Sequence, residues 1–307
     1  MKRILQLAII GIGCLFASCS SVEDTTKRIL LLSGPKSHAW GHHECNSDIS
    51  VLENLLQRET KAKFETKLFL DGAWPQRSEL ENADAIVIIC DGDEKHILKD
   101  RMAEFDTLLE TNEDVGLFFV HYATVPFGRK EADFKGTYFN KWIGGYYAGD
   151  SRSKTLTRYS HIKSKLFDHP VNSGVEPYTI FDEIYYRMEF LEGIQPIVVA
   201  EPIDEVPTFN SPVERMRFGR DNDQVATFES ELERTIFWSF ERERGGRSLG
   251  ITMCHIHKNF WMNESIRKQM VNGVAWIAGL DVPPEGFDAL SLTEEQLNLN
   301  HSAPPKE

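Results

Sequence analysis

The chain has 307 residues, of which 41% are hydrophobic and 26% charged, and its formal net charge is -13 at pH 7. This composition is ordinary for a globular protein of one large domain or two small ones. The acidic balance and the lack of a stripe of Lys and Arg argue against nucleic acid as a partner, because phosphate binding needs clustered cations. The five cysteines, odd in number and without Cys-x-x-Cys spacing, indicate neither a zinc knuckle nor a disulfide framework.

The N-terminus has the pattern of a secretory signal. Lys2 and Arg3 precede an apolar segment over residues 4–16 that is too short to span a membrane as a stable helix. Residues 15–19 (LFASC) resemble a bacterial lipobox, although Phe16 stands where an aliphatic residue is usual. We therefore expect a lipoprotein signal peptide over residues 1–19, with Cys19 as the lipidated residue. The alternative is a plain signal peptide cleaved nearby.

Export and lipidation would tether the protein to a bacterial membrane, in the periplasm or at the cell surface. A short polar tether is expected over residues 20–26, followed by a single domain over residues 27–284 and a polar, loosely docked C-terminal tail over residues 285–307. The sequence has no internal repeat and no domain linker.

The first half of the domain alternates between strands and helices. Short apolar runs predict strands, and apolar residues at a spacing of three and four predict helices. Strands that alternate with helices at this spacing indicate an α/β fold with a mainly parallel sheet and right-handed crossovers. We expect strands at 28–32, 64–70, 85–90 and 115–121, and helices at 48–58 and 98–109.

The second half is richer in strands. Residues 201–224 are polar and contain proline, which indicates an extended surface insertion. A turn is expected at Gly245 and Gly246, and a helix over residues 266–280 closes the domain. We expect strands at 154–163, 179–190, 196–200, 235–240 and 249–257.

Two of the buried strands end in histidine. The strand over residues 115–121 ends at His121, and the strand over residues 249–257 ends at His255 and His257. Open α/β sheets bind ligands at the C-terminal edge, so we expect His121 and His255 to share a site, within about 10 Å of each other. The period of two in a strand would place His255 and His257 on one face. The alternative is that each histidine only caps its strand.

The loop after the first strand also contributes candidates. His42, His43 and Glu44 precede a helix, a position whose residues overhang the sheet edge. Trp40 stands beside them as a surface on which a sugar could stack. A solvated loop without function is the alternative for this segment.

A pair of acids lies inside an apolar strand. An ionised carboxylate at Asp182 or Glu183 would be costly there unless it is paired. Burial would suit Glu183 to general acid or base chemistry, whereas the alternative is a salt bridge to Arg187 or Arg158. Residues 142–147, rich in aromatics and glycine, form either a packed turn or a pocket wall.

Several short motifs follow one another along the chain. They are GPKSH at 34–38, GHHE at 41–44, DAIV at 84–87, GLFFVH at 116–121, WIGG at 142–145, HPV at 169–171, DEIY at 182–185, HIHKNFW at 255–261 and VNGVAW at 271–276. Taken in this order, they resemble the ThuA-like (trehalose utilisation) family. The resemblance implies a flavodoxin-like three-layer α/β sandwich of the class I glutamine amidotransferase type. It also implies a role in the metabolism of disaccharides or their oxidised derivatives, and many members are exported lipoproteins, in keeping with Cys19.

The groups that amidotransferases use are absent. Those enzymes place a Cys at a strand-to-helix elbow and pair it with His and Glu, but here the elbow reads His121-Tyr122-Ala123 and the later motif reads His255-Ile256-His257. Cys254 adjoins His255, but neighbours in a strand point to opposite faces. Glutaminase activity is therefore not expected.

The sequence thus predicts an exported enzyme that acts on a disaccharide or keto-sugar derivative. Its chemistry is either acid–base catalysis or metal-assisted catalysis, with a divalent ion such as zinc. The alternative is a non-catalytic sugar-binding lipoprotein on the same scaffold. The catalytic candidates are His121, Glu183, His255 and His257; the substrate-binding candidates are Trp40, His42, His43, Glu44 and Tyr122; the metal-binding candidates are His43, His121, His255 and His257.

Overall fold

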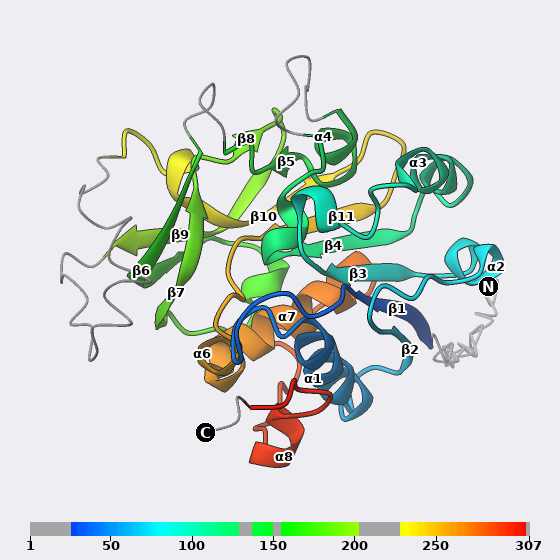
Figure 1. Cartoon of the computed structure of the whole chain (residues 1–307). Coiled ribbons are helices and arrows are strands. Elements are labelled where there is room, and N and C mark those ends of the chain that lie inside the picture. The colour runs from blue at the N-terminus through cyan, green and yellow to red at the C-terminus, as the bar shows by residue number, and fades with distance from the viewer. Residues whose placement is uncertain (1–25, 129–136, 150–154, 203–227, 305–307) are drawn as a thin grey trace, which may run out of the picture.

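A central nine-stranded sheet with helices on both faces forms the molecule (Figure 1). The computed structural model describes residues 26–128, 137–149, 155–202 and 228–304. The lipobox at Cys19 and nearly all of the expected insertion over residues 201–224 lie outside these ranges. Among the described residues, no helix is both long and apolar enough to cross a membrane.

The first half of the chain alternates between strands and helices, which confirms the α/β prediction. Short 3₁₀ turns follow two of the strands. The elements are β1 (Lys27–Ser33), α1 (Cys45–Gln57), β2 (Phe64–Phe69), α2 (Arg77–Glu81), β3 (Ala85–Ile89), η1 (Asp93–Lys95), α3 (Met102–Thr111), β4 (Gly116–Val120), η2 (His121–Thr124) and α4 (Thr137–Ile143).

The second half supplies most of the strands, also as expected, and the last helices. The elements are β5 (Gly145–Tyr146), β6 (Leu156–Leu166), η3 (Pro170–Asn172), β7 (Thr179–Tyr186), β8 (Glu189–Phe190), β9 (Gln195–Pro202), η4 (Leu232–Arg234), β10 (Thr235–Glu241), β11 (Arg247–Ile251), α6 (His257–Met262), α7 (Glu264–Ile277) and α8 (Glu294–Leu297).

The large sheet has a parallel part and an antiparallel extension. Its strand order is β2-β1-β3-β4-β11-β10-β9-β6-β7, and β2, β1, β3, β4 and β11 pair in parallel. The remaining strands continue the sheet in antiparallel pairs. Every residue of β3 and β4 is buried, as expected for strands covered on both faces.

Two hydrophobic cores sandwich the sheet and make the predicted three layers. Ile29 and Leu31 of β1 face one core, which the apolar sides of α1 and α7 complete. Leu30 and Leu32 face the other core, which α3 and α4 cover. Figure 1 shows α1 and α7 on one side of the sheet and α3 and α4 on the other. This arrangement leaves the C-terminal ends of β1, β3, β4 and β11 neighbours along one edge.

The C-terminal segment is packed, contrary to the expectation of a loosely docked tail. Phe287 and Leu297 are buried, and the backbone N–H of Phe287 donates to the side chain of Asn272. Thr293 begins α8 with a capping box. A few apolar residues in an otherwise polar stretch are therefore enough to dock the described part of the tail, up to residue 304.

Candidate active site

His121 stands at the sharp turn that ends β4. Its φ of 53° lies in the left-handed region, where a residue with a side chain is strained unless its surroundings hold it. The ring is held by a hydrogen bond of 2.7 Å between Nδ1 and the carbonyl oxygen of Thr252. The turn thus points the imidazole of His121 over the C-terminal edge of the sheet.

His43 approaches the same point from the loop between β1 and α1. Its φ is 45°, and its backbone N–H donates to the carbonyl oxygen of His255 over 3.0 Å. The ring Nδ1 lies 2.9 Å from a carboxylate oxygen of Asp91, a buried residue just after β3. Asp91 was missed in the sequence analysis, although its place after a buried strand could have indicated it.

Asp182 holds the loop that carries His255. Its carboxylate, fully buried in β7, accepts hydrogen bonds of 2.8 Å from the backbone N–H groups of Cys254 and Ile256. This fixes the position of His255, whose Nε2 lies 3.0 Å from the hydroxyl of Tyr159. Burial raises the pKa of Asp182, and the two nearby histidines and backbone donors oppose that shift.

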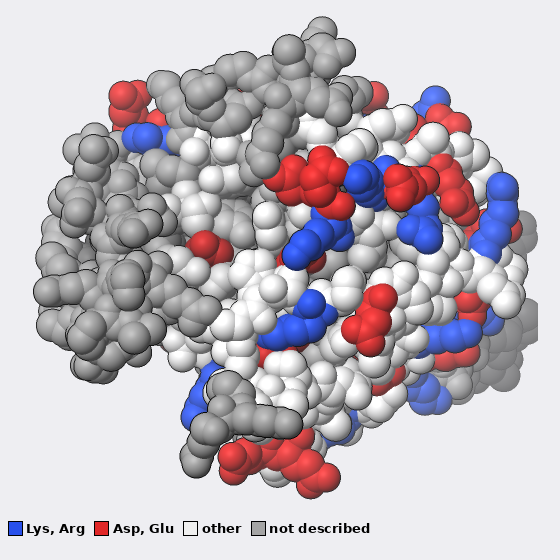
Figure 2. Space-filling view, in the orientation of Figure 1, with Lys and Arg blue, Asp and Glu red and all other residues white. Residues whose placement is uncertain are grey.

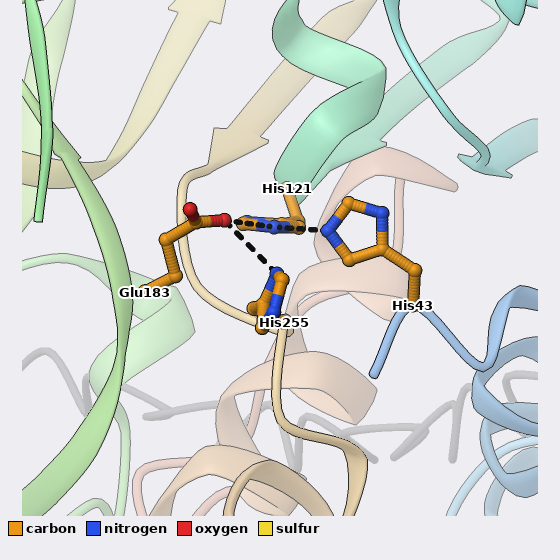
Figure 3. A group of neighbouring side chains, drawn as sticks. All are labelled: His43, His121, Glu183 and His255. Atoms are coloured by element: carbon orange, nitrogen blue, oxygen red, sulfur yellow. Dashed lines mark hydrogen bonds and ion pairs between the residues drawn. The ribbon is translucent and has the colours of Figure 1, made fainter. Parts of the chain in front are cut away.

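The side chains of His43, His121, His255 and Glu183 converge (Figure 3). His121 Nε2 lies 3.0 Å from His43 Nε2 and 3.3 Å from Glu183 Oε2, and His255 Nδ1 lies 2.9 Å from the same Glu183 oxygen. The ring centroids of His121 and His255 are 5.4 Å apart, which confirms the prediction that they lie within about 10 Å. We call these four residues the His–Glu cluster.

Burial and neighbouring charges shift the pKa values of the cluster's members in different directions. Burial alone would raise the pKa of Glu183, but hydrogen bonds and charges from His121 and His255 hold it well below its usual value. Burial would lower the pKa of His121, and Glu183 raises it above its usual value instead. Burial and the neighbouring histidines hold the pKa of His43 well below 6.5. Glu183 is therefore ionised and His43 neutral.

Glu183 is not used in the salt bridges proposed as its alternative role. Arg187 pairs with Glu233 instead, and the side chain of Arg158 lies outside what the structure describes. Glu183 keeps 14% of its side chain exposed, so the cluster is reached from solvent beside it.

His257 lies apart from the cluster, so the predicted common face with His255 is wrong. Strand β11 ends at Ile251, and Cys254 has a φ of 104°, which breaks the alternation of a strand. His257 instead begins α6, where its Nδ1 lies 2.6 Å from Asp48 and its Nε2 lies 2.8 Å from the carbonyl oxygen of Leu297.

Some of the residues proposed to bind substrate lie at the site, and others only stabilise the loop. The ring of His42 lies 4.9 Å from that of His255, and the ring of Tyr122 lies 5.3 Å from that of His43. Glu44 accepts hydrogen bonds from Lys36, from the Gly41 backbone and from Ser302, and so stabilises the loop.

Trp40 stays half exposed, with its Nε1 donating to the carbonyl oxygen of Ser302. His38, partly exposed, lies against His43 with ring centroids 3.7 Å apart and the ring planes tilted by 39°. His38 lies in the GPKSH motif but was not predicted to be a site residue. Its place in the loop after the first strand was the available signal.

Tyrosines from β6, β7 and the segment after β5 surround the cluster. The hydroxyl of Tyr185 lies 3.2 Å from His121 Nε2, and the rings of Tyr185 and Tyr147 lie 4.9 Å apart. Trp142, by contrast, is fully buried against Phe105. Residues 142–147 therefore begin in the packed end of α4 and end, at Tyr147, near the site.

One donor atom from each member of the His–Glu cluster lies within 4.8 Å of the others, a spacing that could hold a metal ion. His38, His43 and Asp91 form a second such group that shares His43. Glu183 therefore takes the place that the sequence analysis gave to His257. On the face shown in Figure 2, acidic and basic side chains are intermingled.

Comparisons with known proteins agree with this architecture. Residues 28–277 match the model of the ThuA family, described as trehalose utilisation. The crystal structure of a ThuA-like protein from Bacteroides uniformis matches with a TM-score of 0.56 and 14% identity, over 86% of this chain and 96% of that one. No curated protein matches significantly.

A glutamine amidotransferase from Thermotoga maritima matches with a TM-score of 0.43 and 8% identity, over 82% of this chain and 98% of that one. The family match extends from β1 to the end of α7 and includes every member of the His–Glu cluster. This chain belongs to the ThuA, or trehalose utilisation, family.

Proposed function

We propose that this protein is an exported enzyme that modifies a disaccharide or keto-sugar derivative, with its chemistry at the His–Glu cluster. The observation that carries the proposal is the convergence of three imidazoles and a carboxylate from four separate segments. Burying such groups costs free energy, because each loses its hydration. Groups of this kind gather where a reaction needs them, and the left-handed backbone at His43 and His121 is strain of the sort that functional sites retain.

The sugar class is supported by the family and by the surroundings of the cluster. The family is described as trehalose utilisation, and trehalose is a disaccharide. The hydroxyls of Tyr159 and Tyr185 lie within hydrogen-bond distance of the cluster, and Trp40, two residues before His42 in the same loop, exposes its ring. Sugars are bound by this combination of hydrogen-bonding groups and aromatic faces.

The reaction class follows from the groups that meet. Imidazoles and a carboxylate can accept a proton from a carbon beside a carbonyl, or from water, and return it to a leaving oxygen. Isomerisation, elimination and hydrolysis of a sugar all need such transfers. The same groups can also bind a metal ion that polarises a carbonyl oxygen.

Glutaminase activity is not part of the proposal. Each of the three cysteines in the described residues is buried: Cys45, Cys90 and Cys254. Burial raises the pKa of the Cys254 thiol well above 9.0, and it raises that of Cys90 to about 12. A cysteine nucleophile reacts as a thiolate, so none of these three thiols suits that role.

The proposed location depends on Cys19. Replacing it by Ala removes the thiol to which a lipid would attach, so Cys19→Ala should give an unprocessed or soluble protein without an acyl label. The measurement is membrane fractionation with a labelled fatty acid, and unchanged labelling of the variant would contradict lipidation at this residue.

The test of the enzyme itself is a turnover screen. Purified protein is incubated with disaccharides, including trehalose, and with their keto derivatives, with and without chelator. We expect turnover of at least one compound and a loss of about a thousandfold in kcat for Glu183→Gln. Binding of sugars without any turnover would instead identify a non-catalytic sugar-binding lipoprotein, and turnover unaffected by Glu183→Gln would place the chemistry elsewhere.

A further inference from the structure

We propose that the His–Glu cluster binds one divalent transition-metal ion, such as zinc, through His43 Nε2, His121 Nε2, His255 Nδ1 and a carboxylate oxygen of Glu183. The inference rests on the proposed function, because it names the group that would polarise the sugar. It decides between acid–base catalysis and metal-assisted catalysis, which the sequence leaves open.

Two of the ring nitrogens direct their lone pairs into the cluster. A backbone carbonyl only accepts hydrogen bonds, so the contact with Thr252 places a proton on His121 Nδ1 and leaves the Nε2 lone pair outward. The carboxylate of Asp91 does the same for His43 Nδ1. Both outward nitrogens face the centre of the cluster (Figure 3).

Several atoms with lone pairs crowd the centre of the cluster. His43 Nε2 and His121 Nε2 lie 3.0 Å apart, and Glu183 Oε2 lies 3.3 Å from the latter. His255 Nδ1 is buried and lies 2.9 Å from the same Glu183 oxygen. Acceptors that converge in this way repel one another unless a positive charge lies among them.

A proton is a poorer match than a metal ion. One proton on His121 Nε2 can point at His43 or at Glu183, but not at both, and a separate proton on His255 Nδ1 is then needed for the contact of that ring with Glu183. A metal ion accepts all four donors at once. Bonds of about 2.0–2.2 Å in tetrahedral geometry put neighbouring donors about 3.3–3.6 Å apart. Three donor pairs here lie 2.9, 3.0 and 3.3 Å apart, and all pairs lie within 4.8 Å.

Each imidazole of the cluster also has a contact on its outer nitrogen. Metal-binding histidines usually engage their other nitrogen with a carboxylate, a carbonyl or another hydrogen-bonding group, which fixes the ring. Here Asp91 holds His43, the Thr252 carbonyl holds His121 and the Tyr159 hydroxyl holds His255. Imidazole with carboxylate is a ligand set that suits divalent transition metals. An ion with five or six ligands would leave positions for the oxygens of a sugar.

The experiment measures binding of metal alone. Purified protein is stripped with chelator, dialysed and titrated with Zn²⁺ and, separately, Mn²⁺ by calorimetry, and elemental analysis is made of protein purified without chelator. We expect one ion per chain. His43→Gln and Glu183→Gln should each weaken binding more than a hundredfold, and Asp91→Asn, which alters only an outer contact, by about 10- to 100-fold. Circular dichroism checks that each variant is folded.

The matched control is His257→Gln, a buried histidine with a carboxylate partner outside the cluster. It should bind one ion with unchanged affinity. Absence of binding, or binding that survives His43→Gln and Glu183→Gln, overturns the inference. Turnover by metal-free protein would contradict a role for the metal ion in the reaction while leaving the proposed enzyme function standing. A bound ion without turnover of any sugar would support the metal site and contradict the proposed enzyme function.

Discussion

His255 and His257 differ by two positions in the chain, yet their surroundings differ in kind. Each is buried and lies less than 3 Å from a carboxylate oxygen, His255 at 2.9 Å and His257 at 2.6 Å. The Nδ1 of His255 faces the nitrogens of His43 and His121 as well as that carboxylate. The nitrogens of His257 instead face the carboxylate of Asp48 and the carbonyl oxygen of Leu297. Burial beside a carboxylate therefore does not mark a reactive histidine, whereas a nitrogen directed at other donors does.

The contacts of His257 identify a structural cation. Its nitrogens face the Asp48 carboxylate and the Leu297 carbonyl, both of which only accept, so the ring carries two protons. Burial would lower the pKa of His257, but the charge and hydrogen bond of Asp48 raise it above its usual value. Asp48 also accepts from Trp261 Nε1. This network joins α1, α6 and α8.

The largest expected effect is that replacing His255 lowers turnover, whereas replacing His257 lowers stability. His255→Ala should lower turnover of the sugar substrate about a thousandfold while changing the free energy of unfolding by about 1 kcal/mol or less. His257→Ala leaves the Asp48 charge buried and unpaired, so it should lower the free energy of unfolding by about 3 kcal/mol and spare turnover of the folded protein. Urea unfolding measures the free energy of unfolding, and initial rates measure turnover. If both variants lost the same quantity to a similar extent, the proposed difference between His255 and His257 would be wrong.

The loop between the two histidines depends on Asp182. Asp182→Ala leaves the buried backbone donors of Cys254 and Ile256 without an acceptor, which should lower the free energy of unfolding by about 3 kcal/mol. Asp182→Asn keeps an acceptor oxygen and should cost less. Urea unfolding of the two variants checks the order, and an equal loss in both would show that hydrogen bonding to the loop is not what matters.

His96 adds a third type, a buried neutral histidine. Its Nδ1 accepts from the backbone N–H of Leu98, so its Nε2 carries the proton that is donated to the Ala123 carbonyl. The neighbouring rings, Phe119 and Phe139, are uncharged. Burial lowers the pKa of His96 from 6.5 to about 4.

This shift fixes the sign of a pH effect. Between about pH 6.5 and 4 the unfolded chain binds the proton and the folded protein does not, so stability falls as the pH falls. His96 should account for about 2 kcal/mol of the loss between pH 7.5 and 5. His96→Gln should remove that share of the pH dependence in urea unfolding, and an unchanged slope would argue that His96 is not buried as a neutral ring.

The smallest effect is expected for a substitution at Trp40. Trp40 is half exposed and contributes little buried area, so Trp40→Ala should change the free energy of unfolding by less than about 1 kcal/mol. Loss of a stacking face for the sugar should raise KM about three- to tenfold with little change in kcat. An unchanged KM would remove Trp40 from the substrate-binding residues.

The sequence predicted the fold and three of the four members of the His–Glu cluster by one physical rule. Buried parallel strands end at a common edge, which brought His121 and His255 together, and the overhanging loop added His43. Glu183 was indicated by the cost of a carboxylate in an apolar strand. His257 was misplaced because nothing in the sequence shows that β11 ends at Ile251 or that Cys254 takes a positive φ.

Other contacts depend on long-range packing that local patterns do not encode. Asp91 and His38 follow buried strands and could have been chosen by the same edge rule. Tyr159 and Tyr185 belong to the antiparallel extension, whose pairing with the parallel strands brings them to the site, and spacing along the chain gives no sign of that. The docking of the C-terminal segment onto His257 and Glu44 likewise joins residues more than 30 positions apart.

The central claim is that His43, His121, His255 and Glu183 face one common point while His257 does not. Anomalous diffraction from crystals soaked in zinc tests it directly, with data above and below the zinc absorption edge. We predict one peak, present only above the edge, about 2.0–2.2 Å from the three ring nitrogens and from a Glu183 oxygen. A peak between His257 and Asp48, or the lack of any peak among the four side chains, would contradict the claim.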